Sequence, residues 1–157
     1  MVIELWHLGK ENTKLVDVAL DEYSKRINRY ISFKIFCIDN SKIPKQLPKS
    51  QLLNKEAELV MQKLQERDCL FLLDENGQQF TSVAFAEKIN TTLNLSHQRI
   101  IFLIGGSYGI APILKAKAYQ LMALSALTFP HQLVRLIFTE QLYRAFSILK
   151  NEKYHHE

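Results

Sequence analysis

Four short segments that are apolar at most positions constrain the fold of this chain more than any other feature. They cover residues 2–8, 33–38, 69–73 and 99–104, and helix-period segments lie between them. A strand with apolar residues on both faces needs cover on both sides, which is typical of parallel sheets with helical crossovers. The sequence therefore predicts an α/β fold with a mostly parallel sheet and helices on both faces.

The first two helical segments each carry an apolar stripe at three- and four-residue spacing. The stripe of the first is predicted to be Leu15, Ala19, Tyr23, Ile27 and Tyr30. The second helix is predicted to start at a Ser50 cap and to bury Leu53, Ala57, Val60 and Leu64. Its charged residues, Lys55, Glu56 and Glu58, are expected to point away from the core.

The next elements follow from turn residues and periodicity. The run 74–77, Asp-Glu-Asn-Gly, predicts a turn that ends the third strand, and Ser82 to Leu93 predicts a third helix. A short helix should follow Pro112, and a last strand is predicted over 118–127.

The final helix is predicted over His131 to Lys150 and is apolar around much of its circumference. Such a helix is typically buried on two sides, here against the sheet and against a second subunit.

Composition predicts a single folded domain over 1–157, since 47% of the 157 residues are hydrophobic and 23% are charged. No apolar run approaches the ~20 residues of a membrane span, and the first residues lack the features of a secretion signal. The two cysteines, Cys37 and Cys69, form no disulfide framework or zinc motif. A cytoplasmic protein with no membrane partner is expected.

The net charge of +4 permits a polyanionic partner without proving one. The stretch 39–49 breaks all periodicity with two prolines and three lysines, Lys42, Lys45 and Lys49. We expect this loop either to track an RNA backbone or to be a solvated connector.

The glycine-rich run 105–109, Gly-Gly-Ser-Tyr-Gly, ends the strongest strand of the sequence. Ligands of open α/β sheets bind at the carboxyl ends of strands, and glycines there let backbone amides approach a ligand. The run lacks the spacing of a dinucleotide fingerprint and the Gly-Lys-Ser/Thr of a phosphate-binding loop. It predicts either a ligand loop or only a tight turn.

A second candidate is the stretch 124–131, which is small or apolar except for Ser125, Thr128 and His131. It could wrap a flat aromatic ring with backbone hydrogen bonds. The alternative is a strand end and turn in which Thr128 caps the last helix and Pro130 is its first residue.

The last helix and tail carry the remaining polar candidates. Glu140 and Arg144 are four residues apart, a spacing that more often gives an ion pair on a helix face than a catalytic pair. Arg135, Tyr154 and His155 complete the group. The sequence contains no metal-binding motif, so we expect no metal cofactor.

Several motifs together resemble one known family over the whole chain. They are Leu103 to Gly109, Leu124 to Arg135, Glu140 to Ala145 and the pair Tyr154-His155, and the resemblance includes Met1 to Gly9 and Lys55 to Glu58. This combination is similar to the RlmH type, formerly YbeA, of SPOUT-class methyltransferases. The resemblance implies a homodimeric enzyme whose sheet ends in a deep C-terminal trefoil knot. It also implies S-adenosylmethionine as methyl donor and N3 of a pseudouridine in large-subunit (23S) ribosomal RNA, within the assembled ribosome, as the target.

The resemblance also assigns residue roles. The donor would be held by Leu73, Gly105, Gly106, Leu124, Ser125, Ala126, Leu127, Thr128 and Phe129. The catalytic group would be Arg135, Glu140, Arg144, Tyr154 and His155, with the tail reaching the donor pocket of the partner subunit. His155 is the first candidate for the base that removes the N3 proton, with Glu140 or water as alternatives. Arg135 and Arg144 fit phosphate or base contacts better than proton transfer.

Two other functions remain open from the sequence. One is a SPOUT methyltransferase that acts on transfer RNA. The other is a non-catalytic module that binds ribosomes and transfers no methyl group.

Overall fold

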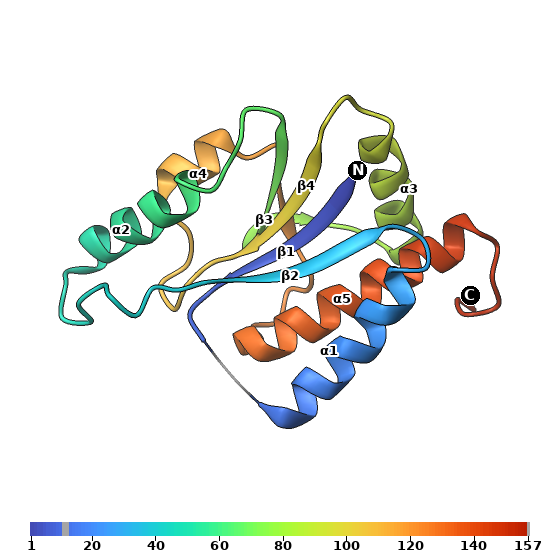
Figure 1. Cartoon of the computed structure of the whole chain (residues 1–157), viewed down its shortest axis with the longest axis horizontal. Helices are drawn as coiled ribbons and strands as arrows, with labels where there is room; N and C mark the ends of the chain where they lie inside the picture. The colour runs from blue at the N-terminus through green and yellow to red at the C-terminus, as the bar shows by residue number, and fades with distance from the viewer. Residues whose placement is uncertain (11–12, 157) are drawn as a thin grey trace.

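The computed structural model describes residues 1–10 and 13–156 of the chain (Figure 1). Its elements, in chain order, are β1 (Val2–Leu8), α1 (Lys14–Ile27), β2 (Ser32–Ile38), α2 (Lys49–Met61), β3 (Asp68–Gln79), α3 (Ser82–Leu93), β4 (Arg99–Ile104), α4 (Pro112–Lys117), β5 (Gln120–Ala123) and α5 (His131–Leu149).

The five strands form one parallel sheet in the order β2-β1-β4-β3-β5. Val2 of β1 lies opposite Ser32 of β2 on one side and opposite Arg99 of β4 on the other. The predicted strands at 2–8, 33–38, 69–73 and 99–104 all lie within this sheet. The α/β fold and its parallel sheet are therefore confirmed.

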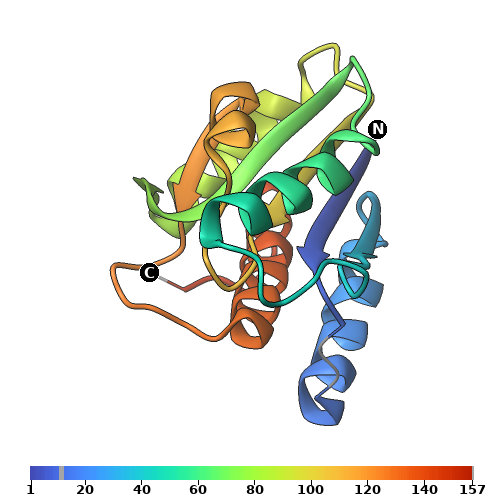
Figure 2. The ribbon, with the colours of Figure 1, turned by 90° about the vertical axis from the view of Figure 1, so that its left-hand side faces the viewer.

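Helices cover both faces of the sheet (Figures 1 and 2), as predicted. Helices α1, α3 and α5 share one apolar core with the sheet, in which Phe71, Phe102 and Phe138 are almost completely buried. Helices α2 and α4 form a second core on the opposite face around Trp6 and Leu72. The central strand β4 is apolar after Arg99 because its side chains alternate between the two cores, with Ile100 and Phe102 in the first and Ile101 and Leu103 in the second.

The predicted stripe of α1 is wrong by one position at its start. Leu15 is 85% exposed, whereas Val16, Leu20 and Ile27 are buried. Two adjacent apolar residues at the start of a helix leave its phase ambiguous, and packing against α5 selects Val16.

The predicted turn at 74–77 is instead a bulge inside β3, because the strand continues to Gln79. The pairing of β3 with β5 shifts register between Leu73 and Gln78. A Cβ at Gly77 would lie 2.4 Å from the backbone nitrogen of Met122, so only glycine permits this approach. The bulge changes the direction of β3 near its end, but the strand continues.

The last strand is shorter than the predicted 118–127, since β5 ends at Ala123 and leaves 124–130 as a loop. The short helix after Pro112 and the helix Ser82–Leu93 are confirmed. Pro130 takes the capping position of α5, and no side chain caps this helix.

Helix α5 packs between α1 and α3 as well as on the sheet. Neighbours within the same chain therefore cover much of the wide apolar surface of α5. The sequence predicted that a second subunit covers part of this surface. Leu133, near the start of α5, is the residue that stays 41% exposed. No helix among the described residues is both long enough and apolar enough to span a lipid bilayer.

Candidate functional site

A cavity of about 640 Å³ opens at the carboxyl edge of the sheet. Its wall comes from the end of β3, the loop after β4, the loop after β5 and the start of α5, segments that are far apart in sequence. Of the nine predicted donor residues, eight line this cavity: Leu73, Gly105, Gly106, Leu124, Ser125, Leu127, Thr128 and Phe129. Ala126 is not part of its wall. The volume is within the range of about 300–1,000 Å³ for small-molecule sites.

The glycine loop is a tight hairpin. The N–H of Gly109 donates to the carbonyl of Gly106 at 3.0 Å, and Gly109 has a φ of +89°, which favours glycine. A Cβ at Gly105 would lie 2.6 Å from the carbonyl oxygen of Gly109. The first glycine is therefore required by the turn itself, and the turn also forms part of the cavity wall. A ligand-binding role for this run stays a prediction.

Gly106 makes a different close approach, one that the sequence did not reveal. Its absent Cβ would lie 2.6 Å and 2.7 Å from the two carboxylate oxygens of Glu56. The expectation that Glu56 points away from the core is wrong, since this residue is 5% exposed. Asn40 donates to its Oε1 at 3.0 Å, and Oε2 has no partner. A side chain at 106 would start toward Glu56 rather than toward the open cavity.

Asp74 follows Leu73 at the cavity wall and is held by two groups. Its Oδ2 pairs with Lys115 Nζ at 2.6 Å, and its Oδ1 accepts the backbone N–H of Asn76 at 3.0 Å. Burial opposes the charge of Asp74, but the Lys115 ion pair and the Asn76 N–H together hold its pKa below the ordinary value. This carboxylate stays ionised and fixes α4 against the end of β3.

The loop after β5 is stiffened by its own side chains. The backbone N–H of Leu127 donates to Ser125 Oγ at 3.0 Å, so that amide is already used within the loop. Leu124 packs against the buried core, whereas Leu127, in the middle of the loop, is 71% exposed. The loop thus presents an anchored residue and an accessible apolar residue to the same cavity.

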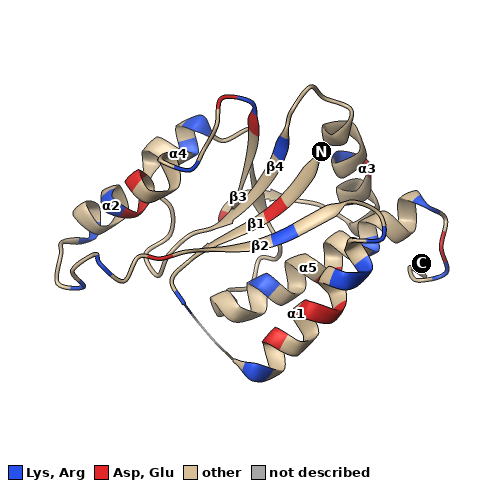
Figure 3. Cartoon of the chain, in the orientation of Figure 1, with Lys and Arg blue, Asp and Glu red and all other residues tan. Residues whose placement is uncertain are grey.

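Lysines lie around the mouth of the cavity. Lys49 lines it and stands 5.9 Å from the ring centroid of Tyr108 in the glycine loop. Lys42 and Lys45 are exposed residues of the loop that leads to α2, and Figure 3 shows basic residues along this loop. Lys49 is the last residue of the predicted basic stretch 39–49. The predicted basic loop therefore adjoins the cavity. Whether it contacts RNA stays a prediction.

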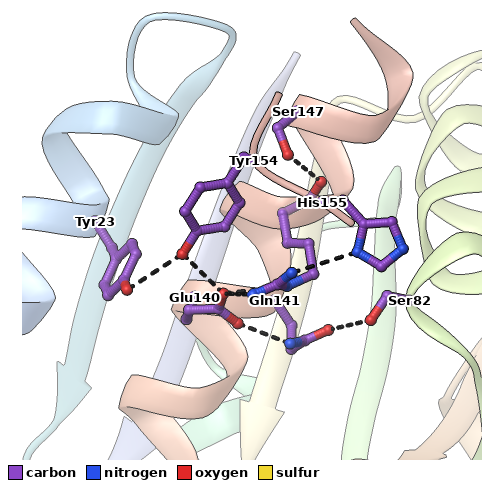
Figure 4. A network of polar contacts seen from close by, with 8 residues as sticks. Tyr23, Ser82, Glu140, Gln141, Ser147, Tyr154 and His155 are labelled. Atoms are coloured by element: carbon purple, nitrogen blue, oxygen red, sulfur yellow. Dashed lines mark hydrogen bonds and ion pairs between the residues drawn. The ribbon is translucent and has the colours of Figure 1, made fainter. Parts of the chain in front are cut away.

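Four of the five predicted catalytic residues meet elsewhere, on the outer part of α5 (Figure 4). Arg144 donates to Glu140 Oε1 from Nη2 at 2.6 Å and from Nε at 3.2 Å. The Tyr154 hydroxyl donates to the same oxygen at 3.0 Å, and Arg144 stands 4.8 Å from the Tyr154 ring centroid. Arg144 Nη1 lies 3.3 Å from His155 Nδ1. None of these residues lines the cavity of this chain.

These contacts engage the polar groups of the tail. A guanidinium has donors and no acceptor, so the contact between Arg144 Nη1 and His155 Nδ1 is a hydrogen bond only with Nδ1 as the acceptor. Burial, followed by the hydrogen bonds to Tyr23 and Glu140, raises the pKa of Tyr154. In this arrangement the tail presents hydrogen-bond donors rather than a free base.

The fifth residue, Arg135, lies apart from that group. It is 5% exposed in the second turn of α5 and does not line the cavity. Among residues 1–10 and 13–156, no cluster of three or more His, Cys, Asp or Glu has the arrangement to hold a metal ion.

Sequence comparison relates the whole chain to one family. The family model described as "Predicted SPOUT methyltransferase" matches residues 1–155. A protein of Flavobacterium johnsoniae, named "Ribosomal RNA large subunit methyltransferase H", is 45% identical over 157 residues that cover 100% of both chains. A protein of the same name from Christiangramia forsetii is 46% identical over 156 residues, 99% of each chain.

Structural comparison agrees at the level of the fold. A probable methylase family protein from Haemophilus influenzae Rd KW20 matches with a TM-score of 0.55 over 97% of this chain and 67% of that chain. Their sequence identity is 14%, so this likeness concerns the fold alone.

Proposed function

Because the chain belongs to the SPOUT methyltransferase family, we propose that it methylates N3 of a pseudouridine in large-subunit ribosomal RNA, with S-adenosylmethionine as donor. The observation that carries the proposal is the cavity at the carboxyl edge of the sheet, which gathers eight of the nine expected donor residues. The full-length relatives named for ribosomal RNA methylation support the choice of substrate.

The cavity suits the donor chemically. Apolar Leu73 and Leu127 offer surfaces for an adenine ring, and the backbone of 124–129 offers hydrogen-bonding groups for its edge. The tight glycine loop brings main-chain groups to the wall without side chains in the way. When bound, the donor would supply an electrophilic methyl group on its sulfonium. Transfer would break the bond from this methyl group to sulfur, and the electron pair of that bond would stay on sulfur.

The residues of the chain have then to position the target base and accept its N3 proton. Positioning two reactants supplies much of the rate of such a transfer. We propose that Tyr154, His155, Arg144 and Glu140 perform this task. The identity of the proton acceptor stays a prediction. His155 would have to leave Arg144 to act as a base through Nδ1, because Arg144 Nη1 contacts that nitrogen in this arrangement.

The separation of the two groups supports a homodimer. The tail network does not line the cavity of its own chain, and a second copy that presents its tail to the cavity of the first would join them. We also propose a cytoplasmic location, action on assembled ribosomes and a knotted path for the C-terminal region. The alternatives are a SPOUT enzyme acting on transfer RNA and a non-catalytic ribosome-binding module.

Methyl transfer from labelled S-adenosylmethionine to ribosomes that lack the modification tests the proposal. Label at N3 of a single large-subunit pseudouridine is expected. Label on transfer RNA instead would favour the first alternative. Equal ribosome binding with and without donor, and no label on any RNA, would favour the second.

A further inference from the structure

Glu56 differs from four other shielded carboxylates of the described residues, each of which has an ion-pair partner. Asp68 and Glu4 pair with Arg99, Asp74 pairs with Lys115, and Glu140 pairs with Arg144. Glu56 is 5% exposed and has no described cation within ion-pair distance. Asn40 donates one N–H to Oε1, and Oε2 has no hydrogen-bond partner.

This carboxylate lies directly behind the wall of the cavity. Both of its oxygens pack against the face of Gly106 where a side chain would begin. Glu56 also lines a small second cavity, and four residues line both this cavity and the large one: Leu53, Gly105, Gly109 and Ile110. One glycine therefore separates the carboxylate from the space that the donor is proposed to fill.

Such an arrangement is costly for the protein alone. A buried carboxylate without a cation loses hydration that one neutral hydrogen bond does not replace. Burial raises the pKa of Glu56, while the Asn40 hydrogen bond and nearby His131 act in the opposite direction. A positive charge placed in the adjacent cavity would offset the cost, because Coulomb interactions are strong where water is excluded.

We propose that Glu56 is a specificity-determining residue that makes the cavity prefer the positively charged methyl donor over its uncharged by-product. This inference rests on the proposed function. S-adenosylmethionine carries a sulfonium, whereas S-adenosylhomocysteine has a neutral thioether and is otherwise the same shape apart from one methyl group. Glu56 acts across Gly106 through its charge, without touching the reacting atoms, and so favours release of the by-product after each transfer.

The variant Glu56→Gln tests the charge at constant shape, since the amide oxygen still accepts from Asn40. Calorimetry should give an affinity for S-adenosylmethionine lowered on the order of tenfold, with affinity for S-adenosylhomocysteine unchanged. Glu58→Gln is the matched control, because it removes the same charge from an exposed position of the same helix, where Glu58 pairs with Lys55. The control should leave both affinities unchanged.

Equal weakening of both ligands by Glu56→Gln would overturn the inference, because a merely structural role lowers both affinities together. An unchanged affinity for the charged donor would overturn it as well. In either case binding by the unaltered protein would leave the proposed function standing. An unaltered protein that binds neither ligand would overturn the proposed function, and this inference with it.

A second measurement needs no variant and so is independent of its folding. Sinefungin carries a protonated amine in place of the sulfonium, and the unaltered protein should bind it with an affinity closer to that of the donor than to that of the by-product. Affinity equal to that for S-adenosylhomocysteine would show that the cavity does not select for charge and would overturn the inference.

Discussion

The cavity at the edge of the sheet and the tail network on α5 are organised in opposite ways. The cavity is a hollow lined by backbone, glycines and apolar side chains, and it keeps one buried carboxylate oxygen unpaired. In the tail network every polar side chain is used, since both oxygens of Glu140 accept hydrogen bonds, from Arg144 and Tyr154 on one and from Gln141 on the other (Figure 4).

The difference separates a binding role from a positioning role. A hollow with an unbalanced charge gains stability when a ligand fills it. A network in which the polar groups are hydrogen-bonded holds its side chains in one geometry, in which they can contact a group from outside the network. On the proposed homodimer, each chain contributes a cavity to one site and a tail to the other.

Truncation after Lys153 should have the largest effect of the changes considered, and it should affect methyl transfer but not donor binding. The variant lacks Tyr154 and His155, so we expect methyl transfer to ribosomes to fall by at least about a hundredfold because the target base is no longer positioned. Calorimetric affinity for the donor should stay within about twofold, since the cavity is built without the tail. Truncation after His155 is the control and should keep full activity. Normal turnover by the shorter chain would remove the tail from the mechanism.

Mixing two inactive variants sharpens the same comparison. Gly106→Arg should lose donor binding, because the arginine collides with Glu56 and displaces the glycine loop. Its tail stays intact, whereas the truncated chain keeps its cavity. Co-refolded in equal amounts, they should recover about a quarter of the unaltered activity, since half of the dimers hold one complete site of two. No recovery, despite mixed dimers on native mass spectrometry, would exclude sites shared between subunits.

A smaller change at Gly106 probes the cavity wall alone. Gly106→Ala should weaken donor binding about three- to tenfold, because its Cβ forces the Glu56 carboxylate and the loop apart. The same steric loss is expected for uncharged S-adenosylhomocysteine, and for that ligand the double variant with Glu56→Ala should regain part of the loss, since its binding does not depend on the Glu56 charge. Gly105→Ala is the control for specificity, since its Cβ meets the Gly109 backbone and the same second change gives no relief. Equal behaviour of the two glycines would contradict the role given to Glu56.

Most of the fold was predictable because apolar periodicity reports burial directly. The segments at 82–93 and 99–104 coincide with α3 and β4. Two failures have local causes. Leu15 and Val16 are adjacent apolar residues whose phase only the packing of α5 decides. The run 74–77 has the residues of a turn, but long-range pairing with β5 carries the strand through it.

The site was predictable only where the resemblance supplied it. Motifs named eight residues that do line the cavity, although no local pattern distinguishes 124–129 from the end of a strand. Glu56 was missed because a glutamate between Lys55 and Glu58 has the pattern of a solvated helix face. Its burial depends on the close approach of a loop 50 positions further along the chain, where Gly106 has no side chain. Periodicity within one helix carries no information about that approach.

The weakest expected effect concerns the ion pair that holds α4 to the end of β3. Lys115→Met should lower the free energy of unfolding at pH 7 by about 1 kcal/mol or less, since Lys115 is partly exposed and solvent screens it. The folded pKa of Asp74 lies below its ordinary value of 3.8, so its ionisation stabilises the fold above that pH and the contribution is lost as pH falls through the folded pKa. Urea unfolding at pH 7 and near pH 3 should therefore show a difference between variant and unaltered protein that shrinks at the lower pH. A difference of the same size at both values would mean that the lysine stabilises α4 through the packing of its aliphatic chain rather than through its charge.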